Sequence, residues 1–102
     1  MPKPDPPLVR IRVDVIELDG VVVARSDEVD KPQRIDALYD GLKRRRQREE
    51  FAVNSEPSRR LLVAFDPQVR AIVVKSVVQT GALAGYHDVA FVVDGGVIPV
   101  GW

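Results

Sequence analysis

Few side chains in this sequence could carry out covalent or metal chemistry. The chain has no cysteine and one histidine, His87, which excludes thiolate nucleophiles, disulfides and a metal site built from several histidines. Asp66 has no second polar group near it in the sequence, and a role as a helix cap explains it. No Ser-His-Asp set, phosphate-binding glycine loop or carboxylate cluster is recognisable. We therefore predict a protein that is not an enzyme and that has no catalytic residue, metal or cofactor.

The most pronounced polar feature is a basic segment in the middle of the chain. Residues 43–60 carry seven basic and three acidic side chains, whereas the formal net charge of the whole chain is zero. Its first part, KRRRQR, supplies the candidate partner contacts Lys43, Arg44, Arg45, Arg46 and Arg48. The segment could be the solvated end of a helix, a surface for a protein or glycan, or a phosphate-binding surface for nucleic acid.

Nucleic-acid binding would also need aromatic side chains on which bases can stack. The only aromatic residues of the predicted strands, Phe65 and Phe91, lie in apolar runs that are typical of a core. We therefore expect no nucleic-acid partner. A small cytoplasmic module that binds nucleic acid or a ligand through the basic segment is the alternative function.

Hydrophobic spacing predicts the elements that position these residues. Residues 8–18 alternate between apolar and polar types, as in a half-buried strand. Asp19-Gly20 then predicts a tight hairpin that leads to a second strand over residues 21–25. Asp30 and Pro32 are typical of a helix start, and an apolar stripe at helical spacing follows them. This first helix would continue into the basic segment.

Residues 69–84 combine the composition of a strand with the spacing of a helix. The segment is rich in valine, which favours strands, but its apolar residues recur at helical intervals and it is longer than ordinary strands. We predict a helix that is capped near Asp66 and ends at Gly85. Short apolar strands over residues 61–65 and 88–94 flank it, so this half of the chain is predicted to be a βαβ unit with parallel strands.

The predicted order of elements is β-β-α-β-α-β. It indicates an α+β, two-layer sandwich in which a mixed four-stranded sheet carries both helices on one face. Three regions follow: a Pro-rich linker over residues 1–7, a domain over 8–94, and a segment over 95–102, GGVIPVGW, that is either a tail or an added edge strand. Pro99 argues against a central strand in that last segment.

The second half of the chain resembles the ExbD/TolR family. Residues 61–93 show the family's arrangement of a strand, an aspartate, a helix with spaced valines, an Ala-Gly turn and a last strand. The matching positions are Asp66, Val69, Val74, Val77, Ala84 and Gly85. The chain departs from the pattern at Ala71, where the family usually has tyrosine, and at Phe65, where it usually has alanine. It is therefore similar to a divergent paralogue within that family.

The resemblance implies the periplasmic domain of a stator at the bacterial inner membrane that is driven by the proton motive force. The Pro-rich linker would then follow a transmembrane helix that this sequence does not contain. The family implies a non-catalytic domain that forms homodimers and binds a multi-spanning inner-membrane partner and an energy-transducing protein that spans the periplasm. In some members this domain binds peptidoglycan, which is therefore a further candidate partner. Such stators drive envelope transport, maintain envelope integrity or power gliding.

Overall fold

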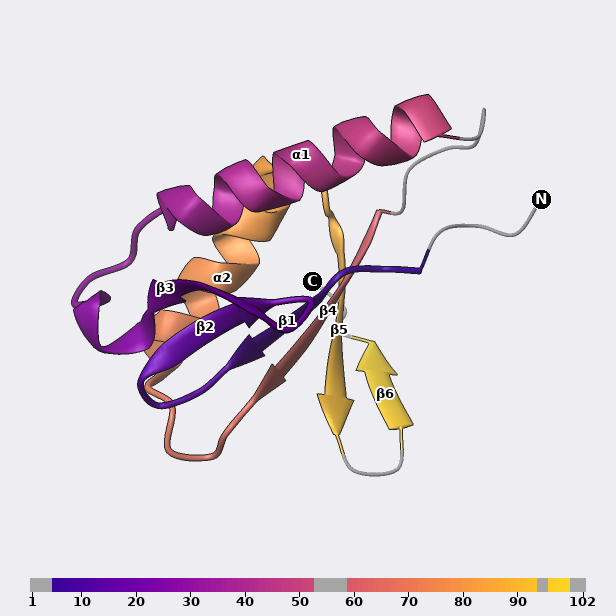
Figure 1. Ribbon diagram of the computed structural model, residues 1–102. Coiled ribbons are helices and arrows are strands. Elements are labelled where there is room, and N and C mark those ends of the chain that lie inside the picture. The colour runs from indigo at the N-terminus through magenta and orange to yellow at the C-terminus, as the bar shows by residue number, and fades with distance from the viewer. Residues whose placement is uncertain (1–4, 53–58, 94–95, 100–102) are drawn as a thin grey trace.

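The computed structural model of this chain describes residues 5–52, 59–93 and 96–99 (Figure 1). Most of the predicted linker, the end of the predicted domain and part of the predicted tail lie outside the described residues. In chain order the elements are β1 Leu8–Ile11, β2 Val15–Leu18, β3 Val21–Arg25, the 3-10 turn η1 Ser26–Glu28, α1 Asp36–Ala52, β4 Arg60–Phe65, α2 Ala71–Leu83, β5 Asp88–Val93 and β6 Gly96–Pro99. Neither helix in this part of the chain has the length and apolar composition that crossing a membrane requires.

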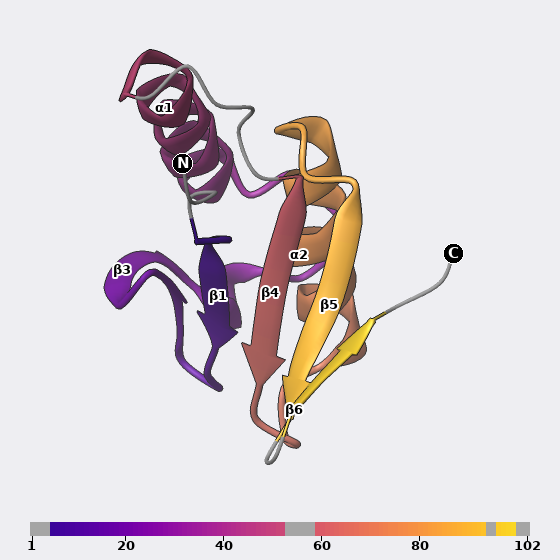
Figure 2. The same ribbon diagram turned by 90° about the vertical axis from the view of Figure 1, so that its right-hand side faces the viewer.

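The strands form one mixed sheet in the order β3-β2-β1-β4-β5-β6. β1 pairs in parallel with β4, and β4 pairs in parallel with β5, whereas the other neighbours are antiparallel. Figure 2 shows β1, β4 and β5 running side by side through the middle of this sheet. The predicted α+β class, with a mixed sheet and two helices, is confirmed. The described residues form six strands rather than the four that were predicted with a possible edge strand. β6 is that added edge strand, and it pairs with β5.

One additional strand arises because residues 8–18 do not form a single continuous strand. The chain turns after Arg12, whose N–H donates to the Val15 carbonyl at 2.8 Å, while the Ser26 hydroxyl donates to the Arg12 carbonyl at 2.6 Å. β1 and β2 therefore fold back on each other as antiparallel neighbours. Val13, which the alternating pattern places on the buried face, lies at this turn and is 56% exposed.

The hairpin predicted at Asp19-Gly20 is confirmed and joins β2 to β3. Both residues have positive φ, 51° and 86°, as a type I′ turn requires. The turn is also bound to the first strand. The Asp19 N–H donates to the Leu8 carbonyl at 2.8 Å, and the Leu8 N–H donates to Asp19 Oδ1 at 3.0 Å. The turn therefore holds the end of β2 beside the start of β1.

The first helix begins later than the sequence predicted. α1 starts at Asp36 rather than near Pro32, and the backbone just before it is bound by α2. The side-chain oxygen of Thr80, which is fully buried, accepts a hydrogen bond from the Ile35 N–H at 2.9 Å. Because a residue distant in the sequence binds this N–H, contact with α2 fixes the place where α1 begins.

The second helix also begins late, and the predicted capping role of Asp66 is wrong. α2 starts at Ala71 with Arg70 at its N-cap, and no side chain caps it. Asp66 instead lies in a turn that follows β4. Its N–H donates to the Ile11 carbonyl at 3.2 Å, and its carbonyl accepts from the Val69 N–H at 3.0 Å. The chain therefore completes a turn bound to β1 before the helix can begin.

The hydrophobic core lies between the sheet and the two helices. Alternate residues of the strands contribute Val9, Ile11, Ile16, Leu18, Leu61, Val63 and Val89. α1 contributes Leu38 and Leu42, and α2 contributes Val73 and Val77. Because these side chains form a single buried cluster, both helices pack on the same face of the sheet.

Each helix places a glycine against a core leucine of the sheet. A Cβ built on Gly81 of α2 would lie 2.5 Å from Leu61 Cδ2, and a Cβ built on Gly41 of α1 would lie 3.0 Å from Leu18 Cδ2. Real Cβ atoms avoid the first distance, because carbon atoms in contact lie about 3.5–4.0 Å apart. Gly81 therefore sets how closely α2 can pack against β4.

Candidate functional site

The six positions that carry the family resemblance lie on α2 and at its two ends. Val77 is fully buried in the core, whereas Val69 and Val74 are half-buried and line a groove beside the helix. Asp66 lies in the turn before α2, and Ala84-Gly85 ends the helix. The structure therefore divides these residues between core packing, chain turns and one open surface.

The end of α2 has the geometry that the sequence predicted. Gly85 has φ of +105°, and its N–H donates to the Ala82 carbonyl at 3.1 Å. The Tyr86 N–H donates to the Gly81 carbonyl at 2.9 Å. This pair of hydrogen bonds defines a Schellman motif, which requires a left-handed residue that glycine adopts without steric cost. Ala84 and Gly85 are thus structural residues that direct the chain into β5.

A groove of about 600 Å³ runs between α2 and the strands β4 and β5. Its apolar lining comes from both sides: Phe65, Val69, Ala71, Val74, Val78, Ala82, Tyr86, Val89 and Phe91. The rings of Phe65 and Phe91 meet edge to face, with centroids 5.4 Å apart. The volume of the groove lies in the range of sites that bind small molecules or single side chains.

The groove is open because α2 covers only part of the sheet. Val73 and Val77 face the core, whereas Val74 and Val78 are each one residue further along and therefore lie about 100° around the helix. Val74 and Val78 therefore face the part of the sheet that α2 leaves uncovered. The first pair is buried in the core, whereas the second pair packs against the edge of the core and also lines the groove.

The polar residues of the groove lie among these apolar side chains. They are Lys75, Gln79 and His87. All of them have exposed side chains, and His87 stands immediately before β5. Polar groups at the edge of an apolar pocket can orient a ligand without filling it.

The basic segment is not one continuous surface. Lys43, Arg44 and Arg48 have exposed side chains, whereas Arg45 and Arg46 are half-buried. The Arg45 guanidinium forms an ion pair with Asp19 and lies 3.3 Å from Glu49 Oε1. The predicted set of partner contacts is therefore divided, and Arg45 links α1 to the β2–β3 turn.

Arg46 has a similar internal role toward α2. Its guanidinium carbon lies 5.3 Å from the centre of the Tyr86 ring, within cation–π range. One of its nitrogens also donates to the Gly85 carbonyl at 3.4 Å. Arg46 thus joins α1 to the turn that ends α2.

Sequence reasoning missed the buried polar groups beneath α1. The side chain of Tyr86 is fully buried and that of Glu49 is nearly so. Burial is the main factor that raises the pKa of Tyr86 to about 12, and the nearby Glu49 carboxylate raises it further. The contact between Arg45 and Glu49 could have been predicted, because oppositely charged residues four positions apart on a helix can form an ion pair. A signal for Tyr86 was its position after Gly85, where an apolar contact often completes a Schellman motif.

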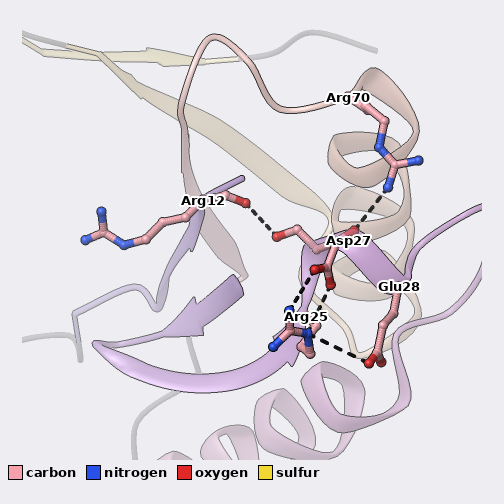
Figure 3. A network of polar contacts seen from close by, with 6 residues as sticks. Arg12, Arg25, Asp27, Glu28 and Arg70 are labelled. Atoms are coloured by element: carbon pink, nitrogen blue, oxygen red, sulfur yellow. Dashed lines mark hydrogen bonds and ion pairs between the residues drawn. The ribbon is translucent and has the colours of Figure 1, made fainter. Parts of the chain in front are cut away.

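A second polar cluster fixes the turn η1 against α2 (Figure 3). The Arg25 guanidinium binds Asp27 through two nitrogens at 3.0 and 2.7 Å, and this pair lowers the pKa of Asp27. Arg70, at the N-cap of α2, donates to the Ser26 carbonyl at 3.2 Å and to the Val29 carbonyl at 2.6 Å. Because these contacts join backbone segments, we assign the cluster to positioning of α2 rather than to ligand binding.

The β3 side of the sheet offers a second exposed apolar surface. Among the strands that the structure describes, β3 pairs with β2 alone and forms one edge of the sheet. Val21 and Val22 on this strand are 65% and 57% exposed. An edge strand has free backbone groups that a further strand can pair with. This edge is therefore a candidate contact for another chain.

The described residues do not contain three or more His, Cys, Asp or Glu side chains that are close enough to hold a metal ion. Comparisons with models of protein families, with curated proteins and with solved structures find no match to this chain. The resemblance to the ExbD/TolR family therefore rests on the residues quoted above.

Proposed function

We propose that this chain is the non-catalytic periplasmic domain of a proton-driven stator of the ExbD/TolR type at the bacterial inner membrane. The observation that carries the proposal is the groove between α2 and β5. Val69 and Val74, two of the positions that match the family, line this groove and are half-buried at the edge of the core. Apolar surface of this kind is costly to leave in water and marks sites of interaction.

In this proposal the domain acts by binding rather than by bond chemistry. It forms a homodimer, for which the exposed β3 edge is one available surface. The groove binds a segment of the energy-transducing protein that spans the periplasm. A multi-spanning partner in the inner membrane converts the proton motive force into movement of the pair, and peptidoglycan is a further candidate partner through Lys43, Arg44 and Arg48, which are exposed.

The arrangement of the basic segment does not favour the alternative of a nucleic-acid-binding module. Such a module would direct its basic side chains outward along one face. Arg45 and Arg46 are instead half-buried and bind groups of the same chain. Phe65 and Phe91 line the groove on the helix-covered face and contact each other, rather than forming an open stacking platform.

Site-specific photo-cross-linking in the native host tests the proposal. A photoreactive residue is placed at Val78 in the groove, and a matched control is placed at Arg44 on the exposed side of α1. We expect the Val78 variant to yield a cross-link to an envelope protein, and a protonophore should change its yield. Equal products from both positions, or products confined to the cytosolic fraction, would contradict the proposal.

A further inference from the structure

The groove between α2 and the strands β4 and β5 combines an apolar interior with a polar rim of one charge sign. The polar lining residues are Lys75, Gln79 and His87, and all three side chains are exposed. Among the described residues, no aspartate or glutamate lines the groove, and the other lining residues are aliphatic or aromatic. A ligand that matches both parts therefore has an apolar body and a negatively charged group.

The acidic residues nearby do not neutralise this rim. Asp88 follows His87 in the sequence, but its Oδ2 accepts a hydrogen bond from Arg60 Nε at 3.0 Å. None of the ion pairs between described residues involves Lys75. Within the described part of the chain, the Lys75 ammonium group is therefore available to an anion from outside.

The spacing along α2 places two hydrogen-bond donors side by side at the rim. Lys75 and Gln79 are four residues apart, so their Cβ atoms lie about 5–6 Å from each other on the helix surface. Each stands one residue after a groove valine, Val74 or Val78, and the polar pair therefore runs parallel to the apolar pair. The ammonium and amide groups both donate hydrogen bonds. A carboxylate can accept from both while an attached chain lies against the valines.

The sheet beneath the groove restricts what can lie inside it. β5 pairs with β4 on one side and with β6 on the other, so it offers no free edge to which a peptide could add as a strand. A peptide backbone along the bottom of the groove would bury N–H and C=O groups without partners. A partner protein can insert apolar side chains while its backbone stays outside. A hydrocarbon chain has no polar groups and can lie along the whole groove.

The dimensions of the groove suit such a chain. Its helix wall extends from Ala71 to Ala82, which is about 16 Å at about 1.5 Å per residue. An extended chain of about twelve carbons is about 14 Å long, with C–C bonds of about 1.52 Å. The volume of about 600 Å³ is also within the range of sites that enclose a small ligand.

We propose that the groove binds a free long-chain fatty acid, with the carboxylate at Lys75 and Gln79 and the hydrocarbon chain between Val78 and Phe91. This inference goes beyond the proposed function and does not depend on it. If both proposals hold, the fatty acid and the apolar side chains of a partner protein compete for one surface. The ligand then regulates partner binding.

Titration of the full chain with dodecanoate, below its micelle concentration, tests the proposal. Calorimetry should show saturable binding of one molecule, and the largest amide shifts in NMR spectra should fall on α2 and β5. Dodecyltrimethylammonium has the same chain and the opposite charge, and it should bind several-fold more weakly. Acetate, which lacks the chain, should cause no such shifts. Failure to saturate, or equal affinity for the two amphiphiles, would overturn the proposal.

Two variants separate the charged group from the apolar wall. Lys75→Gln should weaken dodecanoate binding about three- to tenfold and remove the preference over the cationic amphiphile. The matched control, Lys43→Gln at an exposed position of α1, should leave binding unchanged. Val78→Gln should weaken the binding of both amphiphiles, with the far-UV circular dichroism of the wild type retained.

Two further results would contradict the proposal. The first is equal binding by the Lys75 and Lys43 variants, which would show that overall charge and not the rim attracts the ligand. The second is a set of groove signals that shift with protein concentration before any ligand is added, which would show that a second copy covers the groove.

The fatty-acid site and the proposed function fail in different experiments. A groove that does not bind dodecanoate would remove the fatty-acid site but would not affect a protonophore-sensitive cross-link at Val78. Conversely, saturable dodecanoate binding with no envelope cross-link would support the fatty-acid site and contradict the proposed function.

Discussion

The two helices of this domain pack on the same face of the sheet but use their apolar residues differently. α1 places Leu38 and Leu42 in the core, while its outer surface is polar and basic. α2 places Val73 and Val77 in the core and also presents Val74 and Val78 to an open groove. The difference is one of exposure, because the apolar stripe of α1 is covered by the sheet, whereas that of α2 continues from the core into an open groove. The groove side of α2 is therefore the surface on which our proposed function rests.

The basic residues show the reverse distribution. They are concentrated on α1, yet two of them, Arg45 and Arg46, hold α1 to the rest of the domain. The basic segment therefore contains arginines that anchor α1 as well as exposed ones. Only the groups that each side chain contacts in the folded domain distinguish the two kinds. The comparison between the helices makes four predictions, ordered by the size of the expected effect.

The largest effect is expected from removing a core side chain of α1. Leu38→Ala leaves a cavity in a fully buried site and should lower the free energy of unfolding by about 2–5 kcal/mol. Val78→Ala on the groove side of α2 should cost less than about 1 kcal/mol, because that residue is only half-buried. Urea unfolding followed by circular dichroism measures both. Equal losses would mean that the groove wall belongs to the core.

The second-largest loss of stability is expected from replacing one of two neighbouring arginines of α1. Arg45→Ala removes the ion pairs to Asp19 and Glu49, and the nearly buried Glu49 carboxylate then loses a charged neighbour. We expect a loss of about 1–3 kcal/mol. Arg44→Ala, at an exposed neighbouring position, should change stability by no more than about 0.5 kcal/mol. Thermal unfolding of the two variants side by side decides whether anchoring is confined to Arg45.

A smaller effect should distinguish the glycine contacts of the two helices. Gly81→Ala brings a methyl group within 2.5 Å of Leu61 Cδ2, and overpacking costs about 1–3 kcal/mol. Removing a glycine from a helix returns up to about 1 kcal/mol, so the net loss should be at most about 2 kcal/mol. Gly41→Ala, with a 3.0 Å approach, should be close to neutral. A more stable Gly81→Ala variant would show that Leu61 can move aside.

The smallest effect at neutral pH is expected at Tyr86. Tyr86→Phe removes a buried hydroxyl that has no hydrogen-bond partner among the described residues, so stability at pH 7 should change by less than about 1 kcal/mol. The raised pKa of about 12 means that the folded state holds the phenolic proton more tightly than the unfolded state, whose pKa is about 10. This contribution is therefore complete below about pH 10 and is lost as the pH rises through about 12.

Ultraviolet absorbance of the phenolate across this pH range provides the measurement. The wild type should show a late titration phase that Tyr86→Phe lacks. If both proteins titrate alike, the Tyr86 hydroxyl is accessible to solvent, and the packing of α1 over it is looser than described.

Much of the fold could be predicted because its signals are local. The Asp19-Gly20 hairpin needs positive φ at adjacent residues, and aspartate and glycine in that order accept it. The end of α2 could be predicted for the same reason, because Gly85 also has a positive φ. The valines of α2 form a helix although valine favours strands. Burying Val73 and Val77 in the core stabilises the helix by more than the tenths of a kcal/mol that each valine costs in a helix.

The rest of the fold depended on contacts between residues far apart in the sequence. The break after Arg12 is held by Ser26, and the late start of α1 follows a hydrogen bond to Thr80. Asp66 lies in a turn rather than at the start of α2, and its N–H donates to the Ile11 carbonyl of β1. Each of these partners is too distant in the sequence for a local residue pattern to predict the contact.

The candidate site divides in the same way. The sequence by itself determined the α+β class, the tight turns and the positions that match the family, because turn chemistry and hydrophobic spacing act over a few residues. Only the tertiary structure decided that Val69 and Val74 line a groove while Val77 is buried, and that Arg45 and Arg46 anchor α1. The physical reason is that exposure and pairing depend on what lies opposite a side chain, and the opposite surface here comes from strands and turns elsewhere in the chain.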